Sequence, residues 1–342
     1  MPESQSKSFS YKLLPQSSIH QNCSSRAMAI NKSKTLLLVQ KESFIKCFAF
    51  KRGEIKLLQL FHFGNATVNT LNFQMQKQNI ISGSDKFICK YSSNLMANPK
   101  YIQKCFGQFN TMCLILHPLK EDIIIIGSKI GPIHFLFTNQ IGSNKPFTQT
   151  IQEHNNVLGL SINDQGTRII SCGKDNFLLI IEPNQSNSEL QKCNWIVKQR
   201  LIVEQYGYRI CFINNNQFTF QPSNNSYINY YCEINGMFYK QSQHQIPSNK
   251  QDSFCIFQQV YNQQKSLIFN IYGRVLQIIK FSKEKSLNSD QTDQLFQLEQ
   301  LIDFGERYNP WIYGIISEDA EYIITWDFDS EQIQIRQFQN NQ

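Results

Sequence analysis

The chain has 342 residues, of which 41% are hydrophobic and 13% aromatic, which excludes an intrinsically disordered protein. The formal net charge is +7, but the lysine and arginine residues are dispersed along the chain, which excludes a polybasic tail. No apolar stretch approaches the roughly 20 residues of a membrane helix, so we expect no stable membrane insertion.

Short apolar runs separated by turn signals predict β-strands along the whole chain. The first run, residues 8–14, alternates as a strand does. Seven similar units of about 45 residues follow it, the length of a four-stranded propeller blade. Their approximate bounds are 20–61, 62–106, 107–151, 152–203, 204–246, 254–304 and 305–342.

The clearest unit extends from Glu153 to Ile181. It contains a strand marked by Val157 and Leu160, a tight turn at residues 163–166, a second strand, a polar turn and a wholly apolar third strand. An apolar third strand is typical of a strand that is covered on both faces.

Segments between the units predict the outer, fourth strand of each blade, and the stretch 282–294 predicts a loop. The candidate outer strands are 55–61, 101–106, 147–151, 195–203 and 298–304.

The last unit leaves no room for a fourth strand, so we expect residues 8–14 to complete it and close the ring. The sequence therefore predicts an all-β fold: a seven-bladed β-propeller of four-stranded antiparallel blades, with residues 1–342 as a single domain.

Asparagine and glutamine supply roughly a fifth of the chain, far above ordinary usage. They are scattered, and we interpret them as a bias towards AT-rich codons. The ten cysteines contain no Cys-x-x-Cys pair and stand mostly in apolar runs, which favours small buried side chains in a reducing compartment. Residues 1–18 lack the apolar centre of a signal peptide, so we expect a cytoplasmic protein.

The unit 153–181 resembles the WD-repeat family at several positions together. Residues 163–166 match the family's Ser-Pro-Asp-Gly turn, and residues 171–175 match its Ser-Gly-Ser-x-Asp segment. The resemblance implies that His154, Ser171 and Asp175 are three members of a hydrogen-bonded tetrad that fixes the blade, with Ile181 in place of its tryptophan.

Other units match the family less completely. The last unit carries Thr325 and Asp329 at the tetrad spacing, and the dipeptide Trp326-Asp327 is expected in the turn before Asp329 rather than at a blade end. In the second unit Ser82 and Asp85 match loosely.

No catalytic constellation, metal site or cofactor motif is indicated by the sequence. The six histidines include no pair at metal-ligand spacing, and no Gly-x-x-x-x-Gly-Lys-Ser/Thr loop is present. His154, Ser171 and Asp175 have the residue types of a hydrolytic triad, but their spacing favours the blade-fixing network. We therefore expect a protein that is not an enzyme and holds no cofactor.

A non-enzymatic scaffold or adaptor for protein partners is the leading expectation, because a rigid ring presents loops at little ordering cost. By the resemblance, the loops that enter each first strand form the binding face. Candidate contact residues there are aromatic or arginine side chains: Tyr206, Tyr208, Arg307 and Tyr308.

The alternatives are a phosphoinositide- or nucleic-acid-binding propeller and, less favoured, a propeller enzyme with a site in the central channel. Lys51-Arg52-Gly53 resembles a lipid-binding motif by letters only and falls in an expected turn, and no contiguous basic face is apparent, so we expect no nucleic-acid partner.

Overall fold

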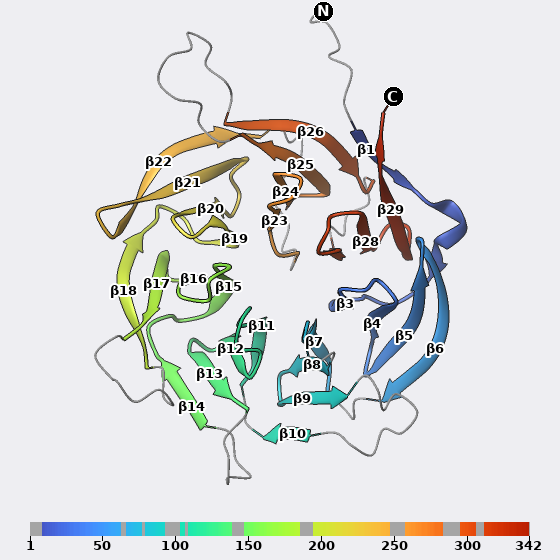
Figure 1. Cartoon of the computed structure of the whole chain (residues 1–342), viewed down its shortest axis with the longest axis horizontal. Helices are drawn as coiled ribbons and strands as arrows, with labels where there is room; N and C mark the ends of the chain where they lie inside the picture. The colour runs from blue at the N-terminus through green and yellow to red at the C-terminus, as the bar shows by residue number, and fades with distance from the viewer. Residues whose placement is uncertain are drawn as a thin grey trace, which may run out of the picture.

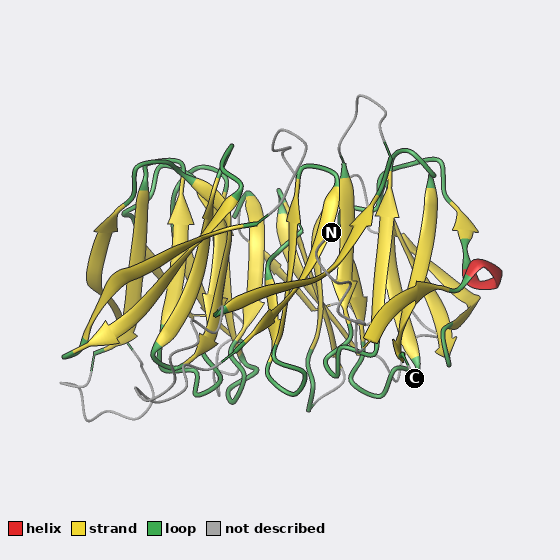
Figure 2. Cartoon of the chain, turned by 90° about the horizontal axis from the view of Figure 1, so that it is seen from above, coloured by secondary structure: helices red, strands yellow, loops and turns green. Residues whose placement is uncertain are grey.

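The strands form seven antiparallel sheets that stand as blades around a central axis (Figure 1). The structure, a computed structural model, describes residues 9–62, 66–76, 79–92, 103–106, 109–138, 147–184, 194–246, 257–282, 295–305 and 311–341. From the side the blades make a disc with loops on both faces (Figure 2). The predicted seven-bladed all-β propeller is confirmed.

The first three blades follow one another in chain order, each from the axis outward. Blade 1 contains β3 (Met28–Ile30), β4 (Leu36–Lys41), β5 (Phe44–Lys51) and β6 (Glu54–His62). Blade 2 contains β7 (Val68–Phe73), β8 (Asn79–Ser84), β9 (Phe87–Ser92) and β10 (Gln103–Phe106). Blade 3 contains β11 (Thr111–Leu116), β12 (Ile123–Ser128), β13 (Ile133–Phe137) and β14 (Phe147–Ile151).

The next three blades repeat this order. Blade 4 contains β15 (Val157–Ile162), β16 (Ile169–Gly173), β17 (Phe177–Pro183) and β18 (Trp195–Ile202). Blade 5 contains β19 (Gly207–Asn214), β20 (Gln217–Pro222), β21 (Tyr227–Ile234) and β22 (Met237–Gln245). Blade 6 contains β23 (Val260–Asn262), β24 (Leu267–Tyr272), β25 (Val275–Phe281) and β26 (Phe296–Asp303).

Blade 7 is assembled from both ends of the chain. Its strands β27 (Ile312–Ile316), β28 (Tyr322–Asp327) and β29 (Gln332–Asn340) are completed by β1 (Phe9–Leu13), which pairs antiparallel with β29. The short β2 (Ile19–His20) also pairs with β29. Between β1 and β2 lies the 3-10 turn η1 (Pro15–Ser17), and no helix in the described ranges is long and apolar enough to span a bilayer. The N-terminal strand closes the ring as predicted.

The core lies between neighbouring blades, because each blade covers the next. Every residue of β12 is buried, as is every residue of β24 and β28. The outer strand β18 instead alternates between partly buried and exposed residues, since only one of its faces meets a neighbour. This radial gradient explains why the middle strands are easily recognised in the sequence.

A polar residue closes the turn that follows the innermost strand in most blades. In blade 4 the Asn163 Oδ1 atom accepts the backbone N–H groups of Thr167 and Arg168, each at 2.9 Å. Such side chains satisfy backbone donors that the turn would otherwise leave unpaired. The equivalent acceptors in other blades are Asn31, His117, Asn262 and Ser317.

Glutamine side chains on three outer strands clasp the backbone of the next blade. Gln199 donates to the Phe238 carbonyl and accepts the Phe238 N–H, both at 2.8 Å. Gln149 makes the same pair of bonds with Trp195, and Gln300 makes it with Tyr11 of the closing strand. A carboxamide suits this role because it offers a donor and an acceptor side by side. At these positions the abundant amides hold blades together.

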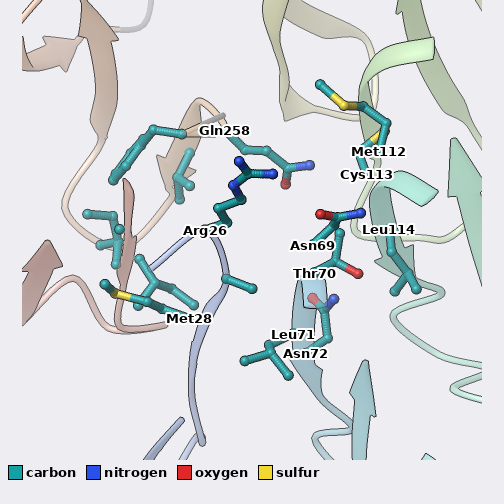
Figure 3. Close-up of a pocket in the computed structure, with 16 residues that line it drawn as sticks. Arg26, Met28, Asn69, Thr70, Leu71, Asn72, Met112, Cys113, Leu114 and Gln258 are labelled. Atoms are coloured by element: carbon teal, nitrogen blue, oxygen red, sulfur yellow. The ribbon is translucent and has the colours of Figure 1, made fainter. Parts of the chain in front are cut away.

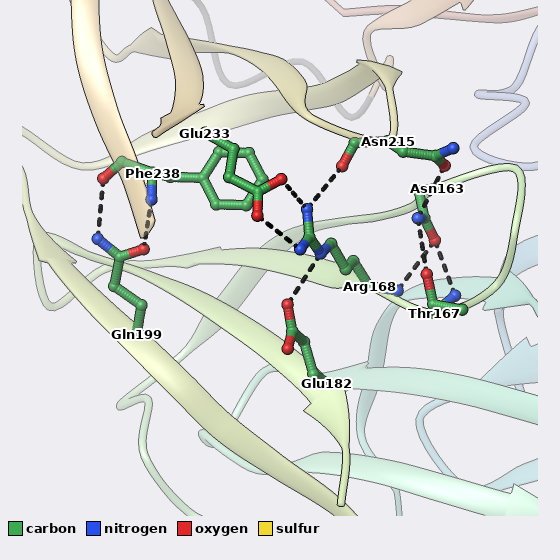
Figure 4. A network of polar contacts seen from close by, with 8 residues as sticks. All are labelled: Asn163, Thr167, Arg168, Glu182, Gln199, Asn215, Glu233 and Phe238. Atoms are coloured by element: carbon green, nitrogen blue, oxygen red, sulfur yellow. Dashed lines mark hydrogen bonds and ion pairs between the residues drawn. The ribbon is translucent and has the colours of Figure 1, made fainter. Parts of the chain in front are cut away.

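An arginine joins blades 4 and 5 on one face of the disc (Figure 4). Arg168 donates to Glu182 at 2.8 Å and binds both carboxylate oxygens of Glu233 from the next blade. Its guanidinium also lies 5.5 Å from the centre of the Phe238 ring. Beside it, Asn163 donates to the Asn215 carboxamide at 2.9 Å. A bidentate, partly buried ion pair of this kind fixes the relative orientation of its two partners and also stabilises the contact between the blades.

Candidate functional site

Each blade presents two loops at the same end of the disc: the loop that leads into its innermost strand and the turn between its second and third strands. We call this end the entry face. In blade 4, His154 lies in the first of these loops and Asp175 in the second, while Ser171 belongs to β16. The three residues therefore approach one another from different segments.

The structure brings these three side chains into one hydrogen-bonded chain. The His154 Nδ1 atom lies 3.0 and 2.9 Å from the two Asp175 carboxylate oxygens, and the Nε2 atom lies 2.8 Å from the Ser171 hydroxyl. Because the carboxylate can only accept, Nδ1–H donates to it and Nε2 accepts the hydroxyl hydrogen. Asp175 also accepts the backbone N–H groups of Asn155 at 2.8 Å and Phe177 at 3.2 Å.

Burial keeps the imidazole neutral. The pKa of His154 is lowered, mainly by desolvation, although the Asp175 carboxylate opposes the shift. A neutral ring has one donor and one acceptor, which matches its two neighbours. The ring also packs directly on the backbone at Gly173, where a Cβ atom would lie 2.4 Å from Nδ1, so only glycine fits.

The same geometry closes the network to a substrate. The His154 side chain and Ser171 are both 0% exposed, and the polar atoms that join them are already engaged. A nucleophile must reach its substrate to act. The arrangement therefore has a structural role: it joins the entry loop of blade 4 to the turn between β16 and β17.

Thr325 and Asp329 of blade 7 have different partners. Thr325 accepts a hydrogen bond from Arg336 at 3.1 Å, whereas Asp329 lies 3.7 Å from the Arg274 guanidinium of blade 6. The expected position of Trp326-Asp327 in a turn is wrong, because both residues belong to β28. The Trp326 indole is buried in the core between blades 7 and 1, and its N–H donates to the Gln21 carbonyl at 2.9 Å.

The aromatic candidates Tyr206 and Tyr208 lie together at the entrance to blade 5. Their rings are perpendicular, with centres 5.9 Å apart, and both are partly buried against the core between blades 4 and 5. Arg307 and Tyr308 lie outside the described residues.

A repeated irregularity of the innermost strands places Tyr208. In blades 2 to 5 the pairing between the first and second strands skips one residue near the start of the first strand. Such a bulge re-aims the side chain of the skipped residue. The skipped residues are Asn69, Met112, Leu158 and Tyr208.

Two of these bulge residues line a cavity of about 250 Å³ on the ring axis (Figure 3). We call it the axial cavity. Asn69 and Met112 contribute from blades 2 and 3, Arg26 precedes β3 of blade 1, and Gln258 precedes β23 of blade 6. Figure 3 shows the Arg26 guanidinium and the Gln258 and Asn69 carboxamides converging on this space. No acidic residue lines it among those described.

A second cavity, of about 400 Å³, lies beside the first on the entry face. Arg26 lines both. Its other walls come from blade 1, with Ser24, Gln40 and Glu42, and from residues 66–67 before β7. Arg26 therefore stands on the partition between two adjoining spaces.

Sequence reasoning missed Arg26, Asn69 and Gln258. The sequence offered one signal: each is a polar residue at or just before the start of an innermost strand. Nothing in the sequence, however, shows that three such residues from distant units meet on the axis.

Within the ranges that the structure describes, no group of three or more histidine, cysteine, aspartate or glutamate side chains could hold a metal ion. The arrangement of the described polar groups around the axial cavity suits hydrogen bonding and charge pairing.

No protein-family model and no curated protein matches the sequence. Among solved structures, a chain in a crystal structure of a mitotic checkpoint complex superposes with a TM-score of 0.71 over 98% of this chain and 95% of that chain. The two sequences are 13% identical, so the likeness concerns the fold alone. With 1498 chains of solved structures matching, the fold by itself carries no function.

Proposed function

We propose that this protein is a propeller of the WD-repeat type that serves as a non-enzymatic scaffold or adaptor for protein partners in a cytoplasmic complex. The observation that carries the proposal is that the rigid ring presents the Tyr206–Tyr208 pair at the entrance to blade 5 and hydrogen-bonding side chains of blades 1, 2 and 6 around the axial cavity. Pre-ordered surfaces of this kind bind proteins without a large ordering cost.

The WD-repeat assignment is supported by the blade-4 network. His154, Ser171 and Asp175 make the contacts that the family resemblance implies for three tetrad members. The fold that this chain shares with a chain from a mitotic checkpoint complex fits a role in an assembly and names no partner.

The rival functions have less support. A channel enzyme needs convergent carboxylates or histidines, and the described walls of the axial cavity offer Arg26 and neutral polar groups. A lipid- or nucleic-acid-binding propeller needs basic side chains that are available to bind phosphate groups. Instead Lys129 pairs with Asp85, Arg200 with Glu153 and Arg168 with two glutamates. Arg52 and Gly53 form the two-residue turn between β5 and β6.

Proximity labelling with a biotin ligase fused to this chain tests the scaffold proposal, with free ligase as the reference. We expect a small set of proteins enriched over free ligase, of which at least one binds the purified chain directly. Enrichment of lipids or nucleic acid alone, or of nothing above the reference, would contradict the proposal.

A further inference from the structure

We propose that the axial cavity is a receptor for the carboxylate side chain of an acidic residue on a protein partner, held by Arg26 with Gln258 and Asn69. This inference rests on the proposed scaffold function and specifies the chemistry of its binding face. It starts from Arg26, a half-buried cation that lines both cavities.

The Arg26 guanidinium has no hydrogen bond or ion pair within the described part of the chain. Three other arginines show the usual arrangement: Arg168, Arg200 and Arg274 each face a carboxylate. The backbone of Arg26 is nevertheless fixed, because its N–H donates to the buried Gln40 carboxamide at 2.8 Å. The side chain is thus presented from a rigid base, and its charge is left for a ligand to balance.

The polar groups around Arg26 suit an anion with two oxygen atoms in one plane, such as a carboxylate. Guanidinium and carboxylate match each other through two parallel N–H···O bonds. Gln258 adds a carboxamide with two further donors. Asn69 donates its amide hydrogens to Asp85 at 2.7 Å and to the Thr111 carbonyl at 3.1 Å, which leaves its carbonyl oxygen towards the cavity. That oxygen can accept an N–H of the partner's backbone.

Two features favour a carboxylate over a phosphate. A single arginine supplies one positive charge, and Lys129 is already paired with Asp85 at 2.7 Å. Glu42 stands in the wall of the adjoining cavity, where it would repel a dianion more strongly than a monoanion. The volume of the cavity, about 250 Å³, lies below the roughly 300–1,000 Å³ of small-molecule sites and suits a single side chain of a partner.

The test uses three libraries of short random peptides that carry glutamate, glutamine or phosphoserine at a fixed central position, each incubated with the purified full chain. We expect the glutamate library to be retained about tenfold better than the glutamine library, equivalent to ~1.4 kcal/mol. Arg26→Gln should remove this preference, and so should Gln258→Glu, which places a negative charge opposite the guanidinium.

Arg52→Gln is the matched control, because Arg52 is exposed in the β5–β6 turn of the same blade and lines neither cavity. It should bind as the unaltered protein does, and thermal unfolding should show that all three variants remain folded. An unchanged preference in folded Arg26→Gln would overturn the proposal, as would Arg26-dependent retention of the phosphoserine library above the glutamate library.

Failure of this inference is distinguishable from failure of the scaffold function. If no library shows an Arg26-dependent preference while proximity labelling yields a direct protein partner, the carboxylate receptor is wrong and the scaffold stands. If labelling also yields no partner, both are wrong.

Discussion

Blades 4 and 5 are neighbours with the same strand order, yet different side chains occupy the equivalent position of their second strands near the entry face. In blade 4 the position paired with Leu160 is Ser171, which joins the His154 network. In blade 5 the equivalent pair is Ile210 with Phe220, a buried aromatic. Glu204, exposed to solvent, stands as far before β19 as His154 stands before β15.

Aromatic packing replaces the polar network in blade 5. The buried Phe220 takes the place of Ser171. Two residues before it on β20, the Phe218 ring stacks on Tyr231 with centres 4.6 Å apart and lies 5.2 Å from the Phe238 ring. The comparison shows that a blade needs buried volume at this level, whereas the hydrogen-bonded network is one way among others to fix its loops. That explains how the repeat can lose its signature residues while the ring persists.

Removing the aromatic centre of blade 5 should have the largest effect. Phe218 is fully buried, so Phe218→Ala should lower the free energy of unfolding by about 3–5 kcal/mol, from lost burial and the cavity left behind. Urea unfolding followed by circular dichroism measures this. Tyr239→Ala, at an exposed aromatic of the same blade, is the control and should change stability by about 0.5 kcal/mol or less. Equal effects would mean that blade 5 is not held by its aromatic core.

Breaking the network of blade 4 should cost less. His154→Ala leaves the buried Asp175 carboxylate without its ring donor, and we expect a loss of about 2–3 kcal/mol in the same assay. Glu204→Ala, at the matching place of blade 5, should be nearly neutral because Glu204 is exposed. An unchanged free energy of unfolding in His154→Ala would refute the structural role of the network.

The contact between the two blades can be weakened by itself. Gln199→Ala removes both bonds to the Phe238 backbone, and we expect a loss of about 1–2 kcal/mol. Gln199→Glu should lose a similar amount, since a carboxylate cannot donate to the Phe238 carbonyl. Gln243→Ala on the exposed outer strand of blade 5 serves as the reference. Hydrogen exchange of the Phe238 amide would locate the effect at this contact.

The smallest expected effect is on the pH dependence of the free energy of unfolding. The lowered pKa of His154 means that the unfolded chain takes up a proton below about pH 6.5 while the folded chain does not, so stability falls as the pH falls through this range. His117, His134 and His244 add to the same trend. His154→Ala should therefore show a shallower decline of unfolding free energy with falling pH than the unaltered protein. Gln243→Ala, which removes no titratable group, should keep the original slope.

The fold was largely readable because the second and third strands are buried on both faces and hence continuously apolar. The outer strand β22 was not recognised separately, since Phe238 is its one buried residue and every residue from Lys240 to Gln245 is polar. The sequence pattern fails where solvent, rather than a neighbouring blade, covers the strand.

The candidate site was less predictable. His154, Ser171 and Asp175 could be named because they are close in sequence and follow a spacing. Arg26 and Gln258 come from blades 1 and 6, and a strand bulge re-aims Asn69. The abundant glutamines looked like compositional bias, yet Gln149, Gln199 and Gln300 act as clasps, a role that depends on which blade lies beside them.

The closing strand has a consequence for the order of folding. Ser10 and Asn341 bond across the seam although they are 331 positions apart, so β1 emerges from the ribosome long before β29 exists. Until synthesis reaches blade 7, the nascent chain carries an apolar strand, with Phe9 and Tyr11, that has no mate. Early blades must form as an open arc, and assembly finishes in one late, long-range step of the kind that slows folding and invites exchange between chains.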